Sequence, residues 1–177
     1  MWSLPRESYY YVVSLDPAEG NVTSDDSALC VMDELGEQVA EGRGKFSPTT
    51  LASYAHKLAN WYNKAGVMPE RNNHGHVIVA WWETEGKGIR ILKGHDDKPG
   101  WNSNRPGKVA LYDSTADAFR QGDTVLRSFA TFSQLSSIDG NELRGPEGQR
   151  DDLADAYALC VAALPQAKRP AFKVHIW

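Results

Sequence analysis

The segment that decides the fold is Ser8-Tyr-Tyr-Tyr-Val-Val-Ser-Leu-Asp16-Pro-Ala-Glu-Gly20, in a chain of 177 residues. Aromatic and β-branched side chains fit a pleated, half-buried surface, so residues 8–15 are predicted to form a strand. Pro17 and Gly20 break this pattern directly after Asp16. The strand therefore holds one carboxylate at its C-terminal end. An acid in this position forms a turn, caps a helix or takes part in chemistry, and the rest of the chain decides among these.

The composition is typical of one globular domain, with 41% hydrophobic and 24% charged residues. The net charge of −4 gives no global attraction to nucleic acid, although local basic patches can still contact phosphate. Cys30 and Cys160 lie in apolar runs and are interpreted as buried thiols, which indicates neither a disulfide scaffold nor a zinc site. No apolar run approaches the roughly 18 residues of a membrane span and no signal peptide is recognisable, so we expect a cytoplasmic setting.

The first half of the chain predicts a second acid at a strand end. The expected elements are, in order, strands at 8–15, 26–33 and 37–45, a helix between Ser47 and Gly66, and a strand at 67–70. Ser47 suits the N-cap of the helix and Pro48 its first position. A helical crossover favours a parallel, right-handed return beside an earlier strand. If that neighbour is the first strand, Asp16 and Glu70 lie side by side.

The second half is expected to contain shorter elements. They are a helix from Asn72 or Asn73 to Trp81, a strand at 87–93, a loop or long hairpin at 94–107, a short helix at 112–121, a strand at 125–132, a loop at 141–149 and a helix at 151–164. Ser114 is the expected cap of the short helix. Pro165 ends the last helix, and the basic residues that follow are expected to be poorly ordered.

Three further carboxylates lie in the first turns of the last helix, within Arg150-Asp-Asp-Leu-Ala-Asp-Ala156. Asp152 and Asp155, and likewise Asp151 and Asp155, are neighbours on the helix surface. Acids at a helix N-terminus can simply complement the helix dipole. Added to two strand-end acids, however, they would repel one another unless some bind protons or cations. Mg²⁺ or Mn²⁺ suits such oxygen ligands, and two ions about 4 Å apart can clamp both oxygens of a phosphodiester displacement.

Four short blocks carry a resemblance to a known family. They are Leu15-Asp-Pro-Ala-Glu-Gly20, Asp26-Ser-Ala28, Pro69-Glu-Arg-Asn-Asn-His-Gly75 and Arg150-Asp-Asp-Leu-Ala-Asp-Ala156. In this order and spacing the chain resembles the nuclease domain of the phage terminase large subunit over roughly residues 8–165. The resemblance implies an α/β, ribonuclease H-like fold: a mixed five-stranded sheet with strand order 3-2-1-4-5, flanked by helices, with an extra hairpin or loop region.

The resemblance also implies a domain organisation and an activity. Residues 1–165 would form a single nuclease domain and residues 166–177 a basic C-terminal tail, in a fragment of a longer chain with an N-terminal ATPase domain. The activity would be two-metal endonucleolytic cleavage of concatemeric double-stranded phage DNA during genome packaging, with little sequence specificity. It would take place in the cytoplasm of the infected bacterial host. The implied partners are double-stranded DNA, the terminase ATPase domain, the small terminase subunit and the portal, and no membrane.

Carried over block by block, the resemblance implies a set of site residues. The catalytic metal ligands for two Mg²⁺ or Mn²⁺ ions would be Asp16, Glu70, Asp151 and Asp152. Asp155 would be an additional or alternate ligand, and Asp26 a possible accessory residue. Family members often have a histidine before the Asp pair, whereas this chain has Arg150.

A basic stretch around Gly100-Trp-Asn-Ser-Asn-Arg-Pro-Gly-Lys108 resembles the family's loop after strand five. Its candidate DNA-binding residues are Lys98, Trp101, Arg105 and Lys108, since basic side chains in loops contact the phosphate backbone. A solvated loop is the alternative. Trp101 would either stack on DNA or anchor the loop.

Two other functions stay open at this point, and a third can be set aside. A structure-selective resolvase or a ribonuclease could use the same fold and the same acids. A non-catalytic DNA-binding or motor-docking module could carry these acids for structural reasons only. An actin-like phosphotransferase also begins with a strand and an Asp, but it requires phosphate-binding loops in two repeats, for which this sequence has no match.

Overall fold

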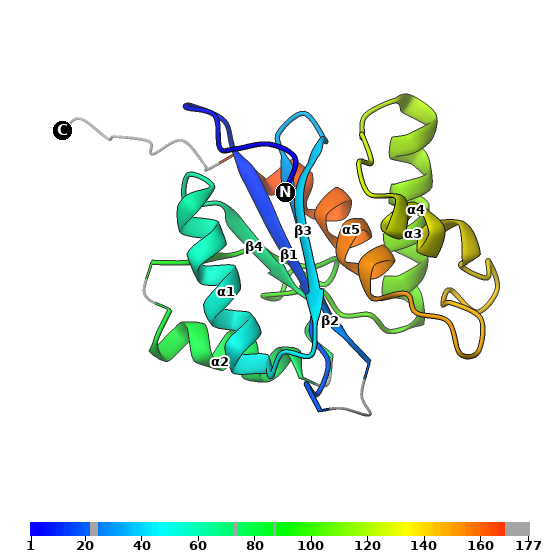
Figure 1. Cartoon of the computed structure of the whole chain (residues 1–177), viewed down its shortest axis with the longest axis horizontal. Coiled ribbons are helices and arrows are strands. Elements are labelled where there is room, and N and C mark those ends of the chain that lie inside the picture. The colour runs from blue at the N-terminus through cyan, green and yellow to red at the C-terminus, as the bar shows by residue number, and fades with distance from the viewer. Residues whose placement is uncertain (22–24, 73, 87, 169–177) are drawn as a thin grey trace.

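A mixed five-stranded sheet forms the middle layer of the structure, a computed structural model that describes residues 1–21, 25–72, 74–86 and 88–168 (Figure 1). The strands are β1 (Tyr11–Asp16), β2 (Ser27–Asp33), β3 (Gln38–Gly44), β4 (Gly66–Pro69) and β5 (Arg90–Ile91). Their order across the sheet is β3-β2-β1-β4-β5, as predicted. β1 runs antiparallel to β2 and parallel to β4, so the crossover places the ends of β1 and β4 at one edge.

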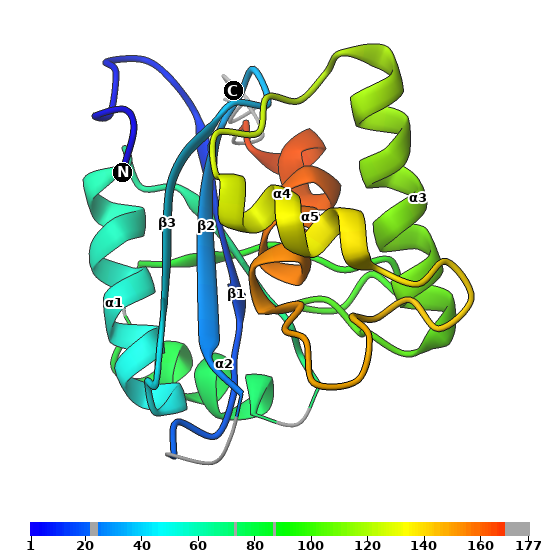
Figure 2. The same ribbon diagram turned by 45° about the vertical axis from the view of Figure 1, so that its right-hand side comes forward.

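Helices cover both faces of this sheet. They are α1 (Pro48–Trp61), α2 (Gly75–Thr84), α3 (Arg105–Gln121), α4 (Phe129–Ser137) and α5 (Asp152–Ala163). α1 and α2 pack on one face, while α5 packs on the other with α3 and α4 outside it (Figures 1 and 2). This is the predicted ribonuclease H-like arrangement. In the part of the chain that the structure describes, every helix is too short or too polar to cross a membrane.

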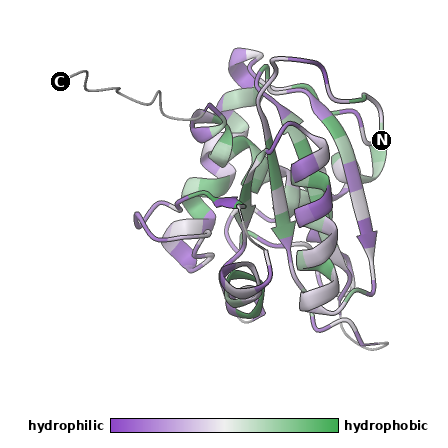
Figure 3. Cartoon of the chain, turned by 90° about the vertical axis from the view of Figure 1, so that its left-hand side faces the viewer, coloured by the Kyte–Doolittle hydropathy of each residue, from purple (hydrophilic) through white to green (hydrophobic). Residues whose placement is uncertain are grey.

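The two faces of β1 supply two separate hydrophobic cores. Val13 and Leu15 pack with α1, whereas Val12 packs with α5. Ser14 lies on the same face as Val12, because side chains alternate along a strand, and its hydroxyl donates to the carbonyl of Ala156 in α5. The hydrophobic colouring in Figure 3 is concentrated on the central strands and the helix surfaces that face them. Asp16 follows in the same alternation and therefore points to the α5 face.

The pairing of β1 with β4 brings the second acid beside the first. Leu15 pairs with Pro69, and the backbone N–H of Glu70 donates to the carbonyl of Leu15 at 2.8 Å. Met68 packs in the α5-side core, so Glu70, two residues later, points to that same face. The predicted neighbour relation between Asp16 and Glu70 is therefore confirmed.

The predicted strand at 125–132 is wrong, because residues 129–137 form α4. Ser128 is its N-cap and accepts a hydrogen bond from the backbone N–H of Thr131. The hydroxyls of Ser128 and Thr131 both donate to the Glu41 carboxylate on β3, at 2.8 and 2.7 Å. Val125 forms only an isolated bridge to Glu37. Capping and these tertiary bonds outweigh the local strand preference of the sequence.

The predicted helix at 112–121 is too short. α3 begins at Arg105, because Asn104 caps it by accepting from the N–H of Gly107 and a proline lies in its first turn. Ser114 is not a cap, since it lies within α3 and its hydroxyl donates to the Leu111 carbonyl. Residues 105–108 are consequently helical rather than part of a loop.

Two other expected segments also differ at their boundaries. The strand predicted at 87–93 contracts to Arg90–Ile91. The start of the predicted tail is packed: Ala167 is buried, and the Arg90 guanidinium donates to the carbonyls of Gln166 and Ala167 at 2.7 Å each. Residues 169–177 lie outside the described part of the chain.

We predict that Gly75→Ala lowers the free energy of unfolding by about 2 kcal/mol, since overpacking beside fixed backbone typically costs this much. A Cβ at Gly75 would overlap the carbonyl oxygen of Glu70, so the start of α2 could no longer pack on the end of β4. Gly140→Ala is the matched control, because nothing lies within 4 Å of its Cβ position. Chemical denaturation of both variants measures the difference, and equal stabilities would refute this account of the α2–β4 contact.

Candidate active site

The five predicted acids line one cleft of about 450 Å³ at the C-terminal end of β1. Asp16 and Glu70 reach it from the ends of β1 and β4, while Asp151, Asp152 and Asp155 reach it from the start of α5. The cleft therefore gathers acids from distant parts of the chain, from Asp16 to Asp155.

Asp16 is the most strongly perturbed acid of the cleft. Part of the residue is exposed, but its carboxyl is enclosed by protein, and this desolvation raises its pKa well above the ordinary value of 3.8. Repulsion by Glu70 and a hydrogen bond with its carboxyl raise the pKa further, and Asp155 adds to the repulsion. Lys108 acts in the opposite direction. An acid held in this way binds a proton or a cation readily.

Asp155 is clamped by two side chains of α3. The Lys108 ammonium donates to Oδ2 of Asp155, and the Tyr112 hydroxyl donates to Oδ1 at 2.6 Å. Burial raises the pKa of Asp155 to about 6, although Lys108 partly offsets this effect. Burial favours the neutral amine of Lys108, but attraction to Asp155 outweighs it and raises the Lys108 pKa. Lys108 is therefore charged and serves as an internal counter-ion for the carboxylates.

Asp152 has one carboxylate oxygen that is buried without a hydrogen-bond partner among the described residues. The residue is 3% exposed, and within the described part of the chain its Oδ2 has no hydrogen-bond partner. Burial raises the pKa of Asp152, while Arg150 and Arg43 lower it. A buried oxygen of this kind is costly unless a proton or cation satisfies it. Asp151 is better satisfied, since its Oδ2 accepts from the N–H of Gly145 at 3.0 Å.

These residues fit a hard divalent cation, since the donors are carboxylate oxygens and one of them is buried without a partner. They do not yet surround a common point: among the described residues, no three Asp, Glu, His or Cys side chains are gathered as ready ligands. The Lys108 ammonium supplies positive charge beside these carboxylates. Ligation would require the acids to close by side-chain rotation.

Asp26, the predicted accessory residue, lies in the same cleft but is already engaged by cations. Its carboxylate forms ion pairs with Arg43, Lys45 and Arg150. Arg150, which stands where a histidine was expected from the resemblance, is thus tied to Asp26.

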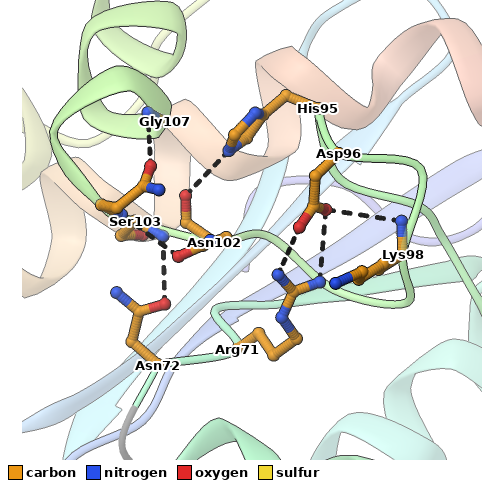
Figure 4. A network of polar contacts seen from close by, with 9 residues as sticks. Arg71, Asn72, His95, Asp96, Lys98, Asn102, Ser103 and Gly107 are labelled. Carbon is orange, nitrogen blue, oxygen red and sulfur yellow. Dashed lines mark hydrogen bonds and ion pairs between the residues drawn. The ribbon is translucent and has the colours of Figure 1, made fainter.

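The loop of residues 93–104 is joined by polar contacts to Arg71 and Asn72, as Figure 4 shows. The Arg71 guanidinium binds both oxygens of Asp96 and lowers the Asp96 pKa to about 2. The N–H of Ser103 donates to Oδ1 of Asn72 at 3.2 Å. Lys98 lies exposed on this loop. The loop is therefore held against the residues that directly follow Glu70.

The remaining candidate DNA-binding residues are placed differently from what the sequence suggested. Trp101 is 6% exposed, packs in the α5-side core and donates its indole N–H to the Gly107 carbonyl, so it anchors the loop and presents no free face for stacking. Arg105 is exposed at the start of α3. The prediction that Lys108 lies in a loop is wrong, because Lys108 is part of α3 and its side chain points onto Asp155.

Two functional contacts were therefore missed in the sequence, namely those of Lys108 and Tyr112 with Asp155. Their spacing of four residues was a usable signal, because it places both on one helix face once α3 is known to begin at Arg105. The ion-pair cluster around Asp26 joins segments far apart in the chain, and the sequence held no sign of it.

The structure is similar to solved nuclease domains of large terminases. The nuclease from thermophilic phage G20c, with bound cobalt, matches with a TM-score of 0.74 at 16% identity, covering 90% of this chain and 84% of that one. The domain from Thermus phage P74-26 matches with a TM-score of 0.66 at 18% identity, covering 89% and 81%.

The nuclease domain of the large terminase subunit of bacterial virus Sf6, with manganese and beta-thujaplicinol, matches with a TM-score of 0.59 at 15% identity. It covers 96% of this chain and 91% of that one. No family model matches the sequence, and no curated protein matches it significantly. At these identities the likeness concerns the fold, and the chain has the fold of the large terminase nuclease domains.

Proposed function

We propose that this chain is a metal-dependent endonuclease that cleaves double-stranded DNA. One observation carries the proposal: acids from β1, β4 and α5 meet in a single cleft, where the pKa values of Asp16, Asp152 and Asp155 are raised and one buried Asp152 oxygen has no partner in the described part of the chain. Perturbed acids in a cleft are typical of catalytic centres. Similarity to nuclease domains solved with magnesium, cobalt or manganese supports the same reading.

Asp16, Glu70 and Asp152 would hold two Mg²⁺ or Mn²⁺ ions, with Asp151 or Asp155 completing the ligand set. The ions would supply Lewis-acid polarisation of the phosphodiester and stabilise the departing oxygen. Lys108 and Tyr112 fix the position of Asp155. The pinned loop of residues 93–104 holds the backbone of Glu70, since the N–H of Trp101 donates to the Pro69 carbonyl and that of Arg71 to the Trp101 carbonyl.

The biological setting that we propose is phage genome packaging in the cytoplasm of the infected host. The chain would be the nuclease part of a longer protein with an ATPase domain, acting on concatemeric DNA with little sequence specificity. The small terminase subunit and the portal would be its further partners. The support for this setting is the similarity of fold to terminase nucleases of three phages.

We predict that Asp16→Asn lowers plasmid nicking in Mn²⁺ by at least about a hundredfold, because it removes a charged ligand at the centre of the cleft. Asp117→Asn, an exposed acid on α3 outside the cleft, is the control. Supercoiled plasmid, a linear duplex, a four-way junction and an RNA–DNA hybrid should be compared as substrates. Unchanged nicking by Asp16→Asn would exclude catalysis in this cleft, and a preference for the junction or the hybrid would favour a resolvase or a ribonuclease.

Lys108→Met should raise the affinity for Mn²⁺ by at least about tenfold, because the ammonium no longer repels a divalent ion from the carboxylates. Titration calorimetry without DNA measures this. Lys57→Met, which removes a lysine on α1 that lies over the Tyr54 ring, should leave the affinity unchanged. A weaker affinity in Lys108→Met would mean that Lys108 helps metal binding by fixing Asp155, rather than opposing it.

The affinity for Mn²⁺ should rise with pH through about 6, the pKa of Asp155. Below that value the proton is bound and the carboxyl is a poor ligand; above it the carboxylate is free to bind the ion, so binding releases protons at lower pH. Calorimetry in buffers with different ionisation enthalpies counts these protons. Binding that is independent of pH between about 5 and 7 would contradict the role assigned to the buried acids.

A further inference from the structure

We propose that Arg43, Lys45 and Arg150, gathered around Asp26, form a clamp for the phosphate backbone of the nucleic acid that is cleaved. The inference rests on the proposed function and adds to it where the substrate strand lies. It places the main backbone contacts on the β3 side of the cleft, opposite the loop of residues 93–104.

Three segments contribute one cation each to this clamp. Arg43 comes from the end of β3, Lys45 from the connection to α1, and Arg150 from the residues before α5. All three pair with the carboxylate of Asp26, at 3.5 Å for Arg43 and 3.2 Å for Lys45. The side chains of these three residues are thus gathered at one place, where the Asp26 carboxylate competes for them with any other anion.

The cations remain accessible in spite of these ion pairs. The side chains of Arg43, Lys45 and Arg150 are 40%, 35% and 43% exposed, whereas that of Asp26 is 11% exposed. One carboxylate, less exposed than the three cations, is shared among them. Their outer surfaces can therefore contact an anion of larger size, and phosphate oxygens accept hydrogen bonds from guanidinium groups in pairs.

The sheet register fixes how far this clamp lies from the acids. Arg43 pairs with Ala28, and Ala28 pairs with Asp16, so the three residues form one row across β3, β2 and β1. Strands are spaced about 4.8 Å apart, which places the backbone of Arg43 about 10 Å from that of Asp16. A nucleic-acid strand covers this distance within a few nucleotides. A strand whose scissile phosphate lies over Asp16 would reach the clamp with phosphates a few positions away.

The clamp would also offset the electrostatic repulsion between the acidic cleft and a nucleic acid. Its acids repel a polyanion, and the whole chain carries a net charge of −4. Arg150 and Arg43 are close enough to lower the pKa of Asp152, so their field extends into the cleft. Fixed cations beside an acidic site provide local attraction where the global charge provides none.

The test is DNA binding by the full chain in EDTA, where metal-dependent cleavage is absent. Fluorescence anisotropy with a labelled duplex should be recorded over a range of salt concentrations for Arg43→Gln, Lys45→Gln and Arg150→Gln. Each variant should bind about fivefold to tenfold more weakly and should lower the slope of log K against log salt by about 1. Arg120→Gln, at the far end of α3 and paired with Asp117, is the matched control and should bind like wild type.

The variant Asp26→Asn should change the affinity for DNA in the opposite direction. It removes the anion that competes with phosphate for the three cations, so binding should become at least about twofold tighter. A cluster that only stabilises the fold would instead show a lower melting temperature without tighter binding. Thermal melts of all variants identify any that fail to fold.

Unchanged affinity in all three neutralised variants would overturn the inference. So would a loss confined to Lys98→Gln, which would place the contacts on the loop of residues 93–104. In both cases Mn²⁺-dependent nicking that Asp16→Asn abolishes would leave the proposed nuclease function intact. Absence of DNA binding and of nicking by wild type would overturn both.

Discussion

The candidate site depends on the alternation of side chains along two parallel strands that are paired in register. β1 and β4 each end in an acid, and their pairing places the two ends side by side. Side chains alternate between the two faces of a strand, and both acids occupy positions that face α5. They therefore point toward the acids of that helix rather than toward α1. A shift of one residue in either strand would turn its acid to the opposite face of the sheet. The packing of Val12 and Met68 in the α5-side core fixes this phase.

A second consequence of this arrangement is a concentration of negative charge that the protein must balance. Lys108 does so from α3 and Arg150 from the residues before α5, while burial, with repulsion between the acids, still raises the pKa values of Asp16 and Asp155. The free energy stored in such a site is available for binding cations. The same excess of charge explains why a polyanionic substrate would need a separate set of cations near the cleft.

The sequence was sufficient for the strands and helices that carry the candidate acids, because strong local signals mark them, whereas the sheet order followed from the family resemblance and is confirmed by the structure. The Tyr-Val run before Asp16 and the capped helix after Ser47 are local patterns, and the Asp residues of α5 lie within one helix turn. It was insufficient where tertiary contacts decide the local structure. The segment around Thr131 is a helix that Ser128 caps and that bonds to Glu41, and Asn104 caps α3 several residues earlier than the apolar spacing suggested. Because α3 was expected to begin later, Lys108 was assigned to a loop. Its contact with Asp155 was therefore not predicted.

The account is tested most directly by a crystal structure with Mn²⁺, using the anomalous scattering of the ion. It predicts anomalous peaks within ligand distance of Asp16 and of the Asp152 oxygen that now lacks a partner, with the Lys108 ammonium withdrawn from Asp155. Ions that bind only outside the cleft, or a cleft in which Lys108 and the acids keep their present contacts at saturating Mn²⁺, would contradict it.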